Sequence, residues 1–113
     1  MHELSLAEEV LRLIEEASVR EGFSAVHAIE LEFGALAAVD RDAFSFAFEA
    51  ISQESRSRGA KLTLATIPAE GRCPSCMVVS PVCDRMEPCS NCGHIPLVVS
   101  GGTGFRVRSI DVE

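Results

Sequence analysis

Apolar residues in the first twenty positions repeat at the spacing of an α-helix. The stripe consists of Leu4, Ala7, Leu11, Ile14 and Ala17, widened by Leu6, Val10 and Leu13. Intervals of three and four residues place such a stripe on one face of a helix. Gly22 predicts the end of the helix. We therefore expect an amphipathic helix from Leu4 to about Arg20.

The next segment alternates between apolar and acidic residues. Its apolar members are Ile29, Leu31 and Phe33, and the acids between them are Glu30 and Glu32. In an extended chain these two sets point to opposite sides. We therefore expect a half-buried β-strand over residues 26–33, closed by Gly34.

A second helix and a second strand follow. Asp40 or a neighbour can cap the first turn of the helix, and Phe44, Phe48 and Ile51 then fall at i, i+4 and i+7. Five of the six phenylalanines precede the cysteines, so we place most of the core there. Residues 61–67 predict the strand, which Pro68 stops.

The last strand is predicted at the carboxyl end of the chain. Phe105 and Val107 alternate with Arg106 and Arg108. Ile110 and Val112 then fall on the opposite face of the strand from Phe105 and Val107, which indicates a bulge or burial on both faces.

Between these strands, residues 69–96 are rich in Cys, Pro, Gly and Ser and carry no periodic apolar pattern. We expect this segment to lack an apolar core of its own and to need a metal. The order of elements predicts an α+β fold, with two helices on one face of a three-stranded sheet whose last strand returns to join the first two. We expect a four-cysteine, zinc-ribbon-like domain over 69–96 to be inserted into an α/β domain of 1–68 and 97–113.

Composition narrows the functional classes. The 113 residues carry a formal net charge of −7 at pH 7 and no basic cluster with interleaved aromatics, which argues against nucleic-acid binding. No apolar run approaches the ~20 residues of a membrane span, and no signal peptide is evident. All five cysteines lie between residues 73 and 92, an odd number that favours metal binding in a reducing compartment. We therefore expect a soluble cytoplasmic protein.

Two CxxC pairs predict a metal site. Cys73 and Cys76 form the first pair, and Cys89 and Cys92 form the second after twelve intervening residues. This spacing is typical of a tetrahedral zinc site, and four thiolates leave no open position for catalysis. The alternatives are a rubredoxin-type iron site and a dithiol redox couple. We interpret Cys83 as an unliganded thiol.

His94 is interpreted as a surface residue or one that supports a ligand, and His27 as a histidine without a ligand role.

The amino terminus offers a second metal site. The amine of Met1, the amide nitrogen of His2 and its imidazole Nδ1 can close two chelate rings around one cation, with the Glu3 carboxylate beside them. Such donors suit Ni(II) or Cu(II). The alternative is a frayed terminus with no function.

Several motifs together resemble the HypA/HybF family over the whole chain. They are Met1-His2-Glu3-Leu4-Ser5-Leu6, Gly34-Ala35-Leu36, Phe46-Ala47-Phe48-Glu49, the two CxxC pairs and Ser109-Ile110-Asp111-Val112-Glu113. Met77 stands where that family often has glycine. The resemblance implies a nickel metallochaperone for [NiFe]-hydrogenase maturation that is not an enzyme.

The resemblance also implies site residues and partners. His2 would be the essential Ni(II) ligand, aided by the backbone nitrogens of the first residues and by Glu3, with Asp40 as a further candidate. A structural Zn(II) would be held by the four CxxC cysteines. Partners would be the HypB GTPase and the hydrogenase large subunit, with the chain as a monomer or homodimer. A zinc-ribbon adaptor without nickel transfer is the alternative function.

Overall fold

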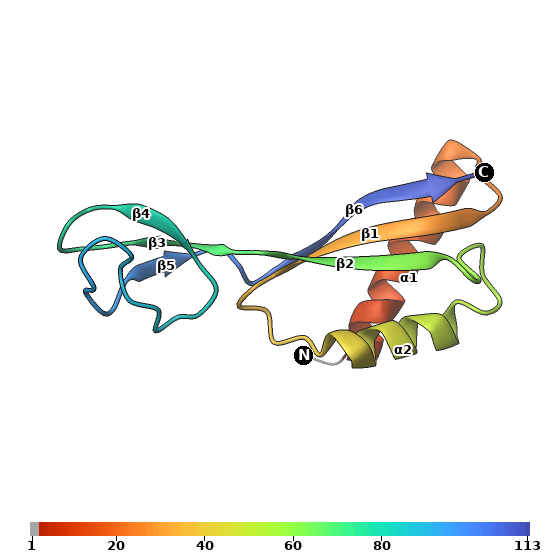
Figure 1. Cartoon of the computed structure of the whole chain (residues 1–113). Helices are drawn as coiled ribbons and strands as arrows, with labels where there is room; N and C mark the ends of the chain where they lie inside the picture. The colour runs from red at the N-terminus through yellow and green to blue at the C-terminus, as the bar shows by residue number, and fades with distance from the viewer. Residues whose placement is uncertain (1–2) are drawn as a thin grey trace. The chain divides into compact units, whose positions relative to one another are not determined.

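The computed structural model describes residues 3–113 and has an α+β fold, as expected (Figure 1). Its elements are α1 (Glu3–Glu21), β1 (Val26–Gly34), α2 (Arg41–Ile51), β2 (Lys61–Ile67), β3 (Ala69–Arg72), β4 (Val79–Val82), β5 (Val98–Ser100) and β6 (Phe105–Val112). Neither helix of the described residues has the length and apolarity that crossing a membrane requires.

The chain forms two compact units. The first comprises the described residues up to Leu31 together with Ala38–Leu64 and Val107–Glu113, and the second comprises Glu32–Ala37 and Ala65–Arg106. The proposed division into 1–68 with 97–113 and 69–96 concerns metal-binding domains and stays a prediction.

One three-stranded sheet has the order β2-β1-β6, so the last strand joins the first two and lies beside β1. Val26 N–H donates to the Arg56 carbonyl (2.9 Å), just before β2, and Ala35 N–H donates to Ile67 at the end of β2 (2.8 Å). β1 and β2 therefore run in the same direction, with α2 as their connection. Glu113 N–H donates to Ala25 (2.9 Å), so β6 runs the opposite way.

The first unit buries a stripe of α1 that differs slightly from the expected one. The buried residues are Leu6, Ala7, Val10, Ile14 and Ser18. Leu4 and Leu13 are instead 51% and 37% exposed, so the core-facing stripe is turned toward Leu6 and Val10. The helix begins at Glu3, a residue earlier than the apolar pattern indicated.

Helix α2 packs against α1 and places alternate phenylalanines inside and outside. Phe44 and Phe48 are buried and stack with ring centroids 6.2 Å apart. Phe46, one of the five phenylalanines that precede the cysteines, is 77% exposed and lies outside the expected core. Residues two apart lie on different faces of a helix, so Phe46 cannot share the buried face.

The two sides of β1 differ as its alternation predicted. Ile29 and Leu31 are buried, whereas Glu30 faces Arg108 of β6 (Oε2–Nε 3.4 Å). Glu32 departs from the expectation, because it is only 7% exposed and accepts a hydrogen bond from Arg106 Nε. A buried carboxylate requires such a partner.

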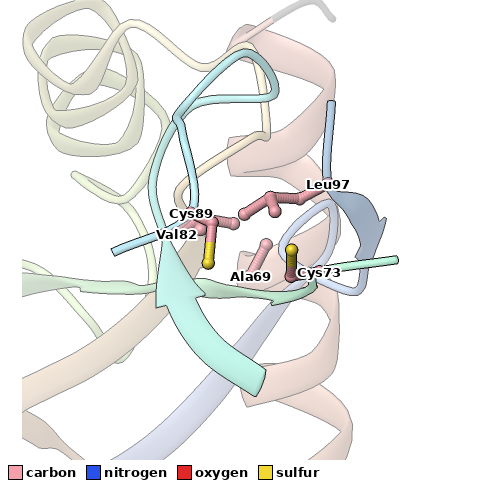
Figure 2. Packing of buried hydrophobic residues seen from close by; sticks show 5 residues of the cluster. All are labelled: Ala69, Cys73, Val82, Cys89 and Leu97. Atoms are coloured by element: carbon pink, nitrogen blue, oxygen red, sulfur yellow. The ribbon is translucent and has the colours of Figure 1, made fainter. Parts of the chain in front are cut away.

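The second unit contains a sheet that the sequence did not indicate. Its order is β4-β3-β5, with both pairings antiparallel and Gly71 opposite Ser80 and Val99. Figure 2 shows its small core of Ala69, Cys73, Val82, Cys89 and Leu97. Residues 69–96 thus take part in a small apolar core that the sequence did not indicate, although Leu97 lies beyond this segment and two of the other four core residues are cysteines. Three strands of three or four residues are too short to produce a readable alternation.

Candidate metal centre

The structure brings the four CxxC cysteines together. Their Sγ atoms all lie within 4.8 Å of one another. Cys73 Sγ is 3.6 Å from Cys92 Sγ, and Cys76 Sγ is 3.6 Å from Cys89 Sγ, so each close contact joins one CxxC pair to the other. All five cysteines of the chain are free thiols. The group is therefore a cluster of potential ligands rather than a pair of disulfides.

The first CxxC pair forms a tight knuckle at the end of β3. Met77 N–H donates to the Cys73 carbonyl (2.9 Å), and Cys73 N–H donates to the Val78 carbonyl (3.0 Å). Cys76 N–H also points at Cys73 Sγ (3.4 Å). Met77 closes the turn with φ of 66°, the left-handed conformation that residues with a Cβ rarely adopt.

The second pair repeats this geometry. Gly93 N–H donates to the Cys89 carbonyl (2.9 Å), and Cys89 N–H donates to the His94 carbonyl (2.9 Å). Gly93 has φ of 79°, the equivalent of the Met77 conformation. The N–H groups of Asn91 and Cys92 point at Cys89 Sγ (3.4 and 3.5 Å). Each knuckle therefore directs peptide dipoles at the first sulfur of its pair.

These donors favour the thiolate form. The Asn91 side chain, with the Val78 backbone, lowers the pKa of Cys76 to about 6. The backbone N–H groups of Cys92 and Asn91 lower the pKa of Cys89. For Cys92 a backbone hydrogen bond involving His94 lowers the pKa, but desolvation and the neighbouring side chains of Cys73, Cys76 and Cys89 outweigh it and raise the pKa to about 12. The crowded sulfurs therefore do not all ionise unless a cation lies between them.

The donor set fits Zn²⁺. Zinc–sulfur bonds of ~2.3 Å in a tetrahedron place the sulfurs about 3.8 Å apart, close to the two separations of 3.6 Å. Cys73 and Cys89 are 0% and 5% exposed, whereas Cys92 is exposed. The cluster is thus anchored in the small core on one side and open to solvent on the other. Four sulfurs occupy all the ligand positions of a tetrahedrally coordinated ion, and iron could be bound in the same geometry.

Cys83 and His94 lie outside the four-cysteine group found among the described residues. Cys83 is an exposed thiol whose backbone N–H donates to Glu87 Oε1 (3.2 Å). The carbonyl of His94 supports the second knuckle.

Two features were not inferred from the sequence: the left-handed Met77 and the role of Asn91. The parallel fragments C-x-x-C-M and C-x-x-C-G were the available signal for the first.

The second predicted site falls partly outside the described residues, because Met1 and His2 are not among them. Glu3 and Asp40 are described and lie together: Asp40 N–H donates to Glu3 Oε2 (3.2 Å). Asp40 also caps α2, since its Oδ1 accepts from Ala43 N–H (3.0 Å). Each carboxylate keeps one oxygen outside these bonds. His27 is elsewhere and contacts Glu113 Oε1 through Nε2 (3.3 Å).

Comparison with known proteins gives a consistent result. A family model described as "Hydrogenase/urease nickel incorporation, metallochaperone, hypA" matches residues 1–112. Hydrogenase maturation factor HypA of Albidiferax ferrireducens is 40% identical over 113 residues, and that of Dechloromonas aromatica is 39% identical, with both chains fully covered in each case.

Solved structures agree on the fold. The solution structure of the Ni metallochaperone HypA from Helicobacter pylori matches with a TM-score of 0.71 at 24% identity, covering 99% of this chain and 97% of that one. At that identity the likeness concerns the fold alone. Because the family model matches residues 1–112 and the relatives match all 113 residues, the chain belongs to the HypA family of hydrogenase maturation nickel metallochaperones.

Proposed function

We propose that this protein binds Ni(II) at its amino terminus and delivers it during maturation of [NiFe]-hydrogenase. Family membership carries the proposal. The contact between Glu3 and Asp40 supports it, because it brings two candidate oxygen donors together at the start of α1. The nickel ion is cargo rather than a resident cofactor.

The donors have distinct roles in this proposal. His2 supplies its imidazole and amide nitrogens, and Met1 supplies the terminal amine. Glu3 supplies a carboxylate oxygen, and its hydrogen bond with Asp40 N–H keeps that side chain near the second acid. Asp40 is the weaker candidate, because Oδ1 already accepts from Ala43 N–H. Nitrogen and oxygen donors of this kind suit Ni(II).

Transfer of the ion follows from the position of the site. A chain terminus contributes only part of a coordination shell, so ligands of a receiving protein can replace it one at a time. The protein makes and breaks no covalent bond of a substrate in this scheme and acts without catalysis. We place it in the cytoplasm, as a monomer or homodimer, with the HypB GTPase and the hydrogenase large subunit as partners.

The zinc site has a separate, structural role. Cys73, Cys76, Cys89 and Cys92 hold Zn²⁺, which balances the charge of their thiolates. Two of these cysteines belong to the core of the second unit, so metal binding and folding of that unit are coupled.

Calorimetric titration of the untagged, zinc-loaded protein with Ni(II) tests the nickel site. We compare the wild type with His2→Ala and with the matched control His27→Ala, since His27 is an exposed histidine paired with Glu113. Loss of binding in His2→Ala alone, with one zinc per chain retained in every protein by elemental analysis, supports the proposal. Equal binding in all three proteins refutes the terminal site.

A zinc-ribbon adaptor without nickel transfer is the second candidate. One observation bears on it: the second unit exposes several large apolar side chains. They are Ile67, Met77, Val79, Met86, Ile95 and Val98. Under this alternative His2→Ala leaves hydrogenase maturation in cells intact.

A further inference from the structure

A cavity of about 320 Å³ lies within the second unit, apart from the metal cluster. Its lining is Glu32, Gly34, Ile67, Gly102, Gly104, Phe105 and Arg106. This volume is at the low end for ligand sites, so it suits one inserted side chain rather than a cofactor.

Backbone hydrogen bonds make the floor of the cavity rigid. Gly34 N–H donates to the Gly104 carbonyl (2.8 Å), Leu36 N–H to Gly102 (2.7 Å) and Ala35 N–H to Ile67 (2.8 Å). A preformed pocket of this kind loses little conformational freedom when it is filled.

The side chains around this floor provide apolar walls. Phe105 is half-buried, and its ring centroid is 6.3 Å from that of Phe33. Ile67 is 42% exposed. The walls therefore combine a fixed aromatic ring with an accessible aliphatic side chain, which suits an apolar guest.

Gly104 lines the cavity without any conformational need for glycine. Of the eight glycines, all within residues 3–113, the other seven have either a positive φ or a neighbouring atom within 3.0 Å of an added Cβ. A Cβ at Gly104 would meet nothing within 4 Å. The absence of a side chain here therefore leaves space rather than relieving strain.

Arg106 gives the cavity its polarity. Its Nε donates to the buried Glu32, and its Nη nitrogens have no partner among the described residues. The side chain is 73% exposed, so a planar edge with several donors faces solvent at the rim. Such an edge matches a carboxylate in a two-point hydrogen bond.

We propose that this cavity is a docking site for a protein partner that inserts an aliphatic side chain flanked in sequence by Asp or Glu. The aliphatic group enters between Phe105 and Ile67 over Gly104, and the acid binds the free edge of Arg106. Charge complementarity favours an acidic partner residue. The exposed charged group at this cavity is the Arg106 guanidinium, whereas the carboxylate of Glu32 is buried and paired with it. The proposal is independent of nickel binding.

The test is a titration followed by NMR amide shifts, using the full-length, zinc-loaded protein. The probes are Ac-Gly-Leu-Asp-Gly-NH2 and Ac-Gly-Asp-Leu-Gly-NH2, with the matched Leu-Asn and Ala-Asp peptides as controls. We expect saturable shifts centred on Gly104 and Arg106 with at least one of the two probes. Replacing Asp by Asn should weaken binding by about tenfold, the usual effect of losing a charge-assisted hydrogen bond.

Variants separate docking from folding. Gly104→Leu should fold, because its Cβ is unobstructed, and should abolish the shifts, whereas Ala50→Leu at an exposed position of α2 should leave them unchanged. Arg106→Lys keeps a cation for Glu32 but loses the planar edge, so binding should weaken. Absence of saturable shifts at millimolar peptide, equal binding of the Asp and Asn peptides, or unchanged binding by Gly104→Leu would each overturn the proposal.

Discussion

Replacing Met77 by glycine should strengthen the zinc knuckle. Met77 occupies the left-handed region with φ of 66°, in a turn equivalent to the one that Gly93 closes with φ of 79°. A side chain in this conformation costs about 1–2 kcal/mol. The Met77 side chain is 61% exposed, so removing it loses little buried apolar surface. The loss of burial therefore offsets only a small part of the strain that is relieved.

The net gain is smaller than the strain itself. Glycine adds freedom to the unfolded chain, which lowers stability by roughly 0.5–1 kcal/mol. Met77→Gly should therefore stabilise the folded, zinc-bound form by about 0.5–1 kcal/mol. Because folding of the knuckle and metal binding are coupled, this corresponds to a zinc affinity about two- to fivefold higher.

Competition with a chromogenic chelator measures that affinity. Met77→Ala, which keeps a Cβ at the same φ, separates backbone strain from loss of the thioether and should bind zinc as the wild type does. Gly93→Ala makes the reverse change, and since its Cβ would meet nothing within 4 Å, the expected weakening reflects conformation alone. If Met77→Gly binds zinc no more tightly than Met77→Ala, the strain argument is wrong.

Three further changes test other parts of the structure. Phe44→Ala should lower the free energy of unfolding by about 3–5 kcal/mol, whereas Phe46→Ala should change it by less than about 0.5 kcal/mol, as chemical denaturation would show. Gly34→Ala should destabilise by about 3 kcal/mol in thermal unfolding, because its Cβ would lie 2.1 Å from the Gly102 carbonyl oxygen; an unchanged melting temperature would contradict this packing. The apparent zinc affinity should fall as the pH is lowered, because zinc binds thiolates and each liganding thiol must lose its proton. Since its surroundings lower the pKa of Cys76 to about 6, the fall should steepen below about pH 6, and chelator competition that shows no added slope there would refute that assignment.

The predictions from the sequence that the structure confirmed were based on periodicity and motif spacing. The α-helical repeat before Gly22 and the alternation around Leu31 depend only on local geometry, so both elements could be read directly. The CxxC spacing also sufficed to predict four clustered sulfurs, because each knuckle is a local turn.

Features that depend on distant residues could not be read in this way. Glu32 resembles an ordinary surface acid until Arg106, far along the chain, is known to pair with it. The cavity above Gly104 likewise requires three strands that are separated in sequence. Asp40 illustrates an intermediate case: its capping role was local and predictable, whereas its contact with Glu3 depends on the packing of two helices.

The position of Cys73 and Cys89 in the small core links the amount of this protein to the zinc supply of the cell. Without the ion, the four sulfurs lose the bonds that hold them together, and the packing of Cys73 and Cys89 against Ala69, Val82 and Leu97 is weakened. A newly made chain that finds no zinc should then expose this segment to proteases, so starvation for zinc would lower the abundance of the protein even while nickel is plentiful. Both metals would thus limit the same maturation step. Nickel would limit it as the cargo, and zinc would limit it by setting how much of the carrier protein escapes degradation.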